Sequence, residues 1–109
     1  MASLITRLWE GSTRAADAER YLAYLHRTGL ADYDRAAGNR GVLALRGIEG
    51  ERADFLLLTF WDSTQAIRRF AGEPIERARF YPEDDAFLIR RGEAVRHMEL
   101  VHHAPLRLP

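Results

Sequence analysis

Two tryptophans, a tyrosine, a histidine and two arginines carry side chains that can bind and activate a small molecule. Aromatic rings stack on flat ligands, an imidazole with an ordinary pKa of ~6.5 accepts a proton near neutral pH, and a guanidinium attracts an anion. A plainer interpretation competes with this one: the tryptophans fill the core and the histidine makes a structural hydrogen bond. The candidate pocket residues are Trp9, Trp61, Tyr81, His97, Arg79 and Arg96.

The sequence lacks the short motifs that hold nucleotides, a catalytic metal or a nucleophilic serine, such as Gly-x-Gly-x-x-Gly and His-Glu-x-x-His. It also has no cysteine. His102 and His103 are adjacent, so on a strand they would point to opposite faces, while His97 and Glu99 have no third ligand in register. We therefore expect no metal and no cofactor, and any catalysis would depend on side chains and on the substrate's own reactivity.

The stretch 53–61 is expected to be the central strand that positions these residues. It is almost entirely apolar and aromatic, whereas a strand with one wet face would alternate with polar residues. Both of its faces must therefore be covered, and the sequence leaves open which of them meets the helices. One face would carry Phe55, Leu57, Thr59 and Trp61, and the other Leu56, Leu58 and Phe60.

Apolar spacing, glycines and capping residues predict the other elements. Further strands are expected over 4–9, 40–48 and 94–101, and a solvated acidic turn over 83–85. Two long helices and a short one are expected between the strands. The first helix is expected to begin at Ser12 or Thr13 and to end at Gly29. The second is expected to begin at Asp62, with Gln65 completing a capping box, and to end at Gly72. The short helix is expected to begin at Pro74.

The order strand, helix, strand, strand, helix, strand is that of the split βαβ unit. We predict an α+β fold, a ferredoxin-like βαββαβ sandwich with an antiparallel sheet. Right-handed crossovers would place both long helices on one face, which leaves an apolar face larger than a soluble monomer exposes. A homodimer through the sheet faces, a dimeric α/β barrel, would cover it. The chain is expected to be a single domain over 1–109, with a core over 4–101 and a tail over 102–109.

The strand directions decide where the candidate residues meet. We expect the first and third strands to be parallel, with the fourth antiparallel to both. That arrangement would bring Trp9, Trp61 and His97 to one sheet edge, where both long helices also begin. Because a helix N-terminus has free N–H groups and a positive dipole end, this edge would favour a carboxylate or a phenolate.

Charge and length exclude several kinds of partner. The 109 residues include 16 basic and 16 acidic side chains, so the net charge is zero. All of the basic ones are arginine, spread along the chain, and no global field attracts nucleic acid or an anionic membrane. No apolar run approaches the ~18 residues of a membrane span. We expect a cytoplasmic protein with neither nucleic acid nor membrane as a partner.

Several short motifs resemble the antibiotic biosynthesis monooxygenase-like family of dimeric α/β barrels, over roughly 4–101. The resemblance implies a cleft between helices and sheet. It also implies that relatives of this chain oxygenate polycyclic aromatic substrates without metal or flavin. In these relatives a phenol of the substrate is deprotonated, and the resulting anion reacts with oxygen. The motifs are Gly38-Asn39-Arg40-Gly41-Val42, the run Leu-Thr-Phe-Trp-Asp-Ser from Leu58 to Ser63, Ala66 and Phe70 in the following helix, and the helix from Pro74.

From this resemblance we hypothesise a cofactor-independent monooxygenase-like protein that acts on a small aromatic or polyketide-like substrate. His97 would accept the proton and Arg79 or Asn39 would hold the anion. Tyr81 and Trp61 would stack on the ring. The expected catalytic residues are His97, Tyr81 and Arg79, and the expected substrate-binding residues are Trp61, Trp9, Asn39 and Arg96.

Three alternatives rank below this hypothesis. A non-catalytic dimeric protein would only bind a small ligand in the same cleft. The resemblance also includes a haem-degrading branch, with an Asn on the first strand, a Trp at the end of the third strand and a haem-binding His in the short helix. In this chain Trp61 matches, but Thr6 stands in place of the Asn, and the short helix has Arg79 and Phe80 with no histidine. RNA binding on the sheet ranks last, because it needs stacked aromatics on an open basic face.

Overall fold

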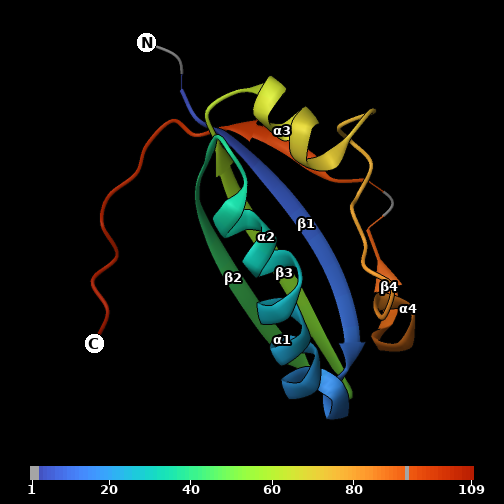
Figure 1. Ribbon diagram of the computed structural model, residues 1–109. Helices are drawn as coiled ribbons and strands as arrows, with labels where there is room; N and C mark the ends of the chain where they lie inside the picture. Colours follow the sequence, from blue (N-terminus) through green and yellow to red (C-terminus); the bar gives the residue numbers. More distant parts are fainter. Residues whose placement is uncertain (1–2, 93) are drawn as a thin grey trace.

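The computed structural model describes residues 3–92 and 94–109 and has an α+β fold (Figure 1). No helix among these residues is long and apolar enough to cross a bilayer. The predicted ferredoxin-like α+β sandwich with an antiparallel sheet is confirmed. The elements are β1 (Ile5–Arg14), a 3-10 turn η1 (Ala15–Asp17), α1 (Ala18–Arg27), α2 (Gly29–Arg35), β2 (Asn39–Glu49), β3 (Arg52–Trp61), α3 (Thr64–Ala71), α4 (Asp84–Phe87), β4 (Leu88–Arg91) and β5 (Arg96–Glu99).

The sheet has the strand order β2-β3-β1-β4, and β5 also pairs with β1. β4 pairs with β1 at residues 11–13 and β5 at residues 5–8, so the two short strands follow one another along the same edge of β1. β1 and β3 are antiparallel, with Ile5 opposite Trp61 and Trp9 opposite Leu57. The prediction that the first and third strands are parallel is therefore wrong, because the β2–β3 hairpin reverses the chain direction before β3.

β3 is the central strand, and its two faces differ in burial as strict alternation requires. Phe55, Leu57, Thr59 and Trp61 are all at most 3% exposed, because α1 and α2 cover this face (Figure 1). The other face carries half-buried side chains from residues 56, 58 and 60. The face that meets the helices, which the sequence left open, is thus the one with Phe55 and Trp61.

Two local predictions at the helix ends are wrong. Ser12 and Thr13 cap no helix, because β1 continues to Arg14 and pairs with β3 over its whole length. α3 is capped by Ser63 instead of Asp62: the Ser63 hydroxyl accepts a hydrogen bond from the Ala66 N–H at 3.1 Å. The predicted break of the first helix at Gly29 is confirmed, since α1 ends at Arg27 and α2 begins at Gly29. The stop at Gly72 is also confirmed, and Gly72 has the positive φ of 82° that favours glycine there.

The segment after α3 also departs from the prediction. No helix begins at Pro74, and residues 72–83 cross from α3 to α4 as turns and irregular chain. The acidic turn is not simply solvated, because Asp84 is 2% exposed and its carboxylate accepts from the Tyr21 hydroxyl at 2.9 Å and from the Tyr81 N–H at 2.6 Å. The last strand, expected over 94–101, is limited to Arg96–Glu99.

The sheet face away from α1 and α2 is apolar and accessible. Leu43 is 37%, Leu45 46% and Met98 48% exposed, and the register places these three beside Leu56, Leu58 and Thr6. The predicted tail leaves the sheet after β5 as an exposed, extended segment (Figure 1). The predicted homodimer would bury the open sheet face, and it stays a prediction.

Candidate functional site

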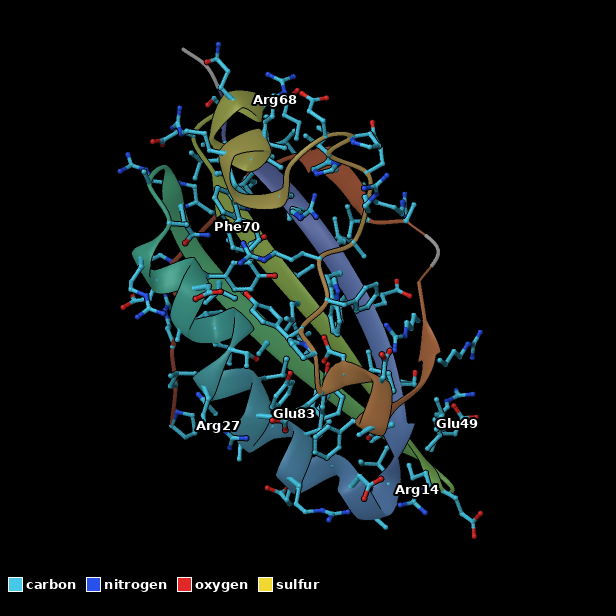
Figure 2. All side chains as sticks on the ribbon, turned by 45° about the vertical axis from the view of Figure 1, so that its right-hand side comes forward. Arg14, Arg27, Glu49, Arg68, Phe70 and Glu83 are labelled. Atoms are coloured by element: carbon cyan, nitrogen blue, oxygen red, sulfur yellow. The ribbon has the colours of Figure 1, made fainter. Side chains whose placement is uncertain are left out.

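Trp61 lies at the centre of an aromatic cluster between the sheet and the helices. It is 0% exposed, and its indole N–H donates to the Thr59 hydroxyl at 2.8 Å. The Tyr33 and Phe70 rings lie 6.4 and 5.2 Å from it, and Figure 2 shows Phe70 reaching from α3 toward α2. Burial raises the pKa of Tyr33 to about 12, so this phenol stays neutral. The layer where the family resemblance implies a cleft is filled here by rings.

Arg79 and Tyr81 join this cluster at its outer side. The Arg79 guanidinium lies 4.6 Å from the Phe70 ring centre and 5.3 Å from that of Tyr81. Asp32 accepts from the Tyr81 hydroxyl and from Arg79 at 3.4 Å. Burial and this carboxylate raise the pKa of Tyr81. A hollow of about 330 Å³ borders the group, lined by Asp32, Arg35, Ala36, Ala37, Ala66, Arg69, Phe70 and Arg79.

His97 lies on β5 and contacts a buried arginine that the sequence analysis missed. The register pairs His97 with Arg7, and the His97 Nε2 lies 3.0 Å from the Arg7 Nη1. A guanidinium has donors only, so Nε2 is the acceptor and the neutral ring carries its proton on Nδ1. Burial, followed by the charge of Arg7, lowers the pKa of His97. The imidazole is therefore neutral at pH 7.

Arg7 is 1% exposed although it carries a charge. Its other donors reach two backbone carbonyls, that of Ile75 and that of Arg77 at 3.0 Å, and burial lowers its pKa. An arginine nonetheless stays protonated in a protein. The sequence did contain a signal: Arg7 shares a strand face with Ile5 and Trp9, and a charge on an apolar face calls for an explanation.

A second hollow, of about 420 Å³, opens beside His97 between β5 and α3. Ile5, Ile67 and Ile75 give it apolar walls, and Ile75 also binds Arg7 through its carbonyl. Trp61 lies behind this wall, since it is the cross-strand partner of Ile5. The remaining lining residues are Ser3, Thr64, His97, Met98 and Glu99.

The other predicted site residues lie apart from His97. Trp9 is 5% exposed, its ring centre lies 6.0 Å from that of Phe80, and it pairs with Leu57 in the middle of the sheet. Asn39 is opposite Trp61, and its side-chain oxygen accepts from the Gly41 N–H at 3.0 Å. Arg96 pairs with Leu8 and so points to the open sheet face. Strand alternation thus separates Arg96 from His97.

The expected meeting of both helix starts at one sheet edge is wrong. The helical turns of η1 and α1 follow the end of β1, and α3 follows the end of β3, and these strands are antiparallel. Figure 2 places Arg14, the last residue of β1, and Arg68 of α3 at opposite ends of the molecule. Of the helices that the structure describes, only α3 therefore starts beside the His97 hollow, at Thr64, and Arg7 lies behind His97.

Within residues 3–92 and 94–109, no group of three His, Asp or Glu side chains is placed to hold a metal ion. The chemistry on offer is that of a neutral imidazole beside a hollow of mixed polarity, with a buried guanidinium behind the imidazole. Such a pair can accept one proton at His97, although burial and Arg7 lower the pKa of the imidazole and so make it a weaker base. The guanidinium can stabilise one negative charge, an effect that is stronger at low dielectric than in water.

This arrangement defines an α+β protein of the ferredoxin-like type with its polar pair on the helix side of the sheet. No protein-family model and no curated protein matches the chain. Solved structures do match it, among them a Bacillus cereus protein named "putative antibiotic biosynthesis monooxygenase", with a TM-score of 0.66 and 8% identity over 96% of this chain and 100% of that one.

Two further similar structures have names that refer to a reaction or a ligand. SnoaB from Streptomyces nogalater, a cofactor-independent oxygenase, has a TM-score of 0.60 and 18% identity over 96% of this chain and 98% of that one. MhuD, solved with two manganese protoporphyrin IX molecules per active site, has a TM-score of 0.59 and 19% identity over 93% and 98%. The chain has the fold of the antibiotic biosynthesis monooxygenase-like proteins, which confirms the resemblance at the level of the fold.

Proposed function

We propose that this protein is a cofactor-independent monooxygenase-like enzyme that acts on a small aromatic substrate bound in the hollow beside His97. The observation that carries the proposal is a neutral imidazole on the wall of a hollow that three isoleucines also line, in contact with a buried cation. The hollow's volume of about 420 Å³ lies in the usual range for small-molecule sites. The fold shared with a cofactor-independent oxygenase supports the same reaction class.

In the proposed reaction the phenolic O–H of the substrate donates to His97 Nε2, which takes the proton. The resulting phenolate is electron-rich and transfers electrons to molecular oxygen, the only oxidant needed. One oxygen atom enters the ring and the other leaves as water, so a phenol plus O₂ gives a quinone plus water. Ile5, Ile67 and Ile75 would hold the ring and exclude water, and Trp61 would support this wall from behind.

Tyr81 and Arg79 enter this proposal in a changed role. Arg79 lines the hollow between α2 and α3, and Tyr81 is bound to Asp32. Their part would be to keep Phe70 packed on Trp61, through the Arg79 contact with the Phe70 ring and the bond from Arg79 to the Phe70 carbonyl at 2.9 Å. Trp9, Asn39 and Arg96 would have no direct contact with the substrate.

Oxygen uptake tests the proposal. With a dihydroxynaphthalene probe and no added cofactor, the purified protein should consume oxygen, and His97→Gln should lower the rate by about 10² to 10⁴. His103→Gln, a change of an exposed tail histidine, is the matched control and should leave the rate unchanged. Equal rates for wild type and His97→Gln would show that His97 is not the base.

A non-catalytic ligand-binding protein is the second candidate. The observation that favours it is that the Nε2 lone pair of His97 already accepts from Arg7, so a substrate must first break that contact. Saturable binding of aromatic probes without any oxygen uptake would support this candidate. Haem degradation finds less support, because the segment 74–83 that follows α3 contains no histidine to bind the iron.

A further inference from the structure

Arg7 is the buried charge that the oxygenase reaction as written above does not use. Its donors go to an imidazole and two carbonyls, all uncharged. Among residues 3–92 and 94–109 no carboxylate lies within ion-pair distance of it, while nine other arginines have such partners. Removing a lone charge from water is unfavourable by several kcal/mol, even after relaxation. A cation kept in the core without an anion is therefore a functional-site candidate.

The position of Arg7 connects it to the hollow. His97 lines the hollow and contacts Nη1, and Ile75 lines the hollow and accepts from the same nitrogen. His97 is the only one of these partners that a side-chain rotation can remove, because the two carbonyls belong to the backbone. Rotation of His97 would leave Nη1 facing the hollow, fixed in place by Ile75 and Arg77.

We propose that Arg7 binds the negatively charged oxygen of a flat aromatic ligand, which replaces His97 at Nη1. The inference rests on the proposed function, since it supplies the group that holds the anion in that site. It assigns to Arg7 the part that the sequence analysis gave to Arg79 or Asn39. Arg79 already binds Asp32 at 3.4 Å and lines the hollow between α2 and α3, and Asn39 binds Gly41.

The ligand class follows from the two ends of the site. The isoleucine walls favour a ring system, and the guanidinium favours a carboxylate or phenolate lying in the plane of that ring, because its donors are fixed in one plane. Two carboxylates repel a bound anion and so weaken its binding: Glu99 in the lining of the hollow and Glu76 near Arg7. Both are exposed, so water and salt screen them more than they screen Arg7.

The test compares a charged and a neutral ligand of the same shape. The probes are naphthoate and naphthamide of matched substitution, with dissociation constants from calorimetry. A charge-assisted hydrogen bond contributes about 1.5 to 3 kcal/mol, so wild type should bind naphthoate about ten-fold to a hundred-fold more tightly. Arg7→Met should bring the ratio to about one, and Arg7→Lys should keep part of the preference.

Arg79→Met removes the competing candidate cation. Any loosening of the wall behind the hollow would affect both probes alike, so the ratio should stay unchanged although the separate affinities can fall. Equal affinity of the two probes for wild type would overturn the proposal, and so would loss of the preference in Arg79→Met but not in Arg7→Met. If Arg7→Met does not fold, nitrogen NMR of the wild-type His97 ring decides. Naphthoate, but not naphthamide, should shift the Nε2 resonance, and an unchanged resonance would refute the replacement.

The two proposals fail in different ways. A preference for naphthoate that depends on Arg7, together with no oxygen uptake from any phenol, would leave Arg7 as the anion-binding residue of a ligand-binding protein and refute the oxygenase reaction. Oxygen uptake that depends on His97, without any preference for naphthoate, would refute only the role of Arg7.

Discussion

At the scale of single residues, the pair Arg7 and His97 is the feature that departs most from an ordinary core. Apolar burial explains Trp61, Ile67 and Leu57, whereas a guanidinium at 1% exposure needs a reason beyond packing. The imidazole that it contacts must stay neutral to keep accepting its hydrogen bond. The state of His97 is thereby coupled to the stability of the whole layer between sheet and helices.

This coupling predicts a pH dependence of stability. Burial and Arg7 lower the pKa of His97 in the folded state, so the unfolded chain binds the proton more readily. The stabilising contribution is present above the unfolded pKa of ~6.5 and is lost as the pH falls. The melting temperature should fall between about pH 7.5 and about pH 5.5, and by less in His97→Gln, which cannot titrate there.

Three carboxylates provide the control for that experiment. Each of them has its pKa lowered mainly by a side-chain hydrogen bond. The pairs are Asp17 with Arg20, Asp32 with Tyr81, and Asp54 with Ser12. Their contributions are present above their unfolded values of ~3.9 and are lost only at more acidic pH. Identical melting curves for wild type and His97→Gln over the range near neutrality would mean that His97 has no such coupling.

At the scale of elements, β3 decides how the molecule is layered. Alternate residues of this strand face the helices and the open side of the sheet, so neighbouring leucines experience different surroundings. Leu57 is 2% exposed on the helix side, and Leu56 is half-buried on the other side. The same substitution at the two positions therefore probes two different interfaces.

Leu57→Asp should unfold the protein, because a carboxylate placed in that core has no partner and ionised groups are strongly disfavoured there. Leu56→Asp should keep the fold and weaken only contacts made through the open face. Circular dichroism melting curves of the two variants check this prediction. Equal destabilisation by both changes would contradict the assignment of the two faces.

At the scale of the whole molecule, the open sheet face and the exposed tail are the surfaces without an observed cover. Leucines of β2 and β3 are paired with one another on this face, and Met98 of β5 is exposed on the same face beyond β1. Contiguous apolar patches mark interaction sites. A second copy packed face to face is the partner that supplies an equally apolar surface.

Light scattering at micromolar concentration should accordingly give twice the mass of the chain. Leu56→Asp should shift the protein toward the monomer mass without loss of helix signal, because the charge would lie in the interface. Arg40→Ala, a change at an exposed ion pair with Asp62, is the control and should stay dimeric. A wild-type monomer at this concentration would refute the dimer.

The sequence by itself determined the layered α+β fold and the importance of 53–61. Period-two burial and the order of elements are local properties, so the apolar run, Gly29 and Gly72 could be interpreted without knowledge of distant contacts.

Only the tertiary structure decided the strand directions, the choice of face and the partner of His97. Whether β1 is parallel or antiparallel to β3 depends on how the chain returns through the β2–β3 hairpin, and no local pattern encodes that path. Arg7 and His97 are far apart in sequence and meet because β5 adds to the edge of β1 in one register. A shift of one residue would turn His97 to the other face and leave the buried guanidinium without its imidazole.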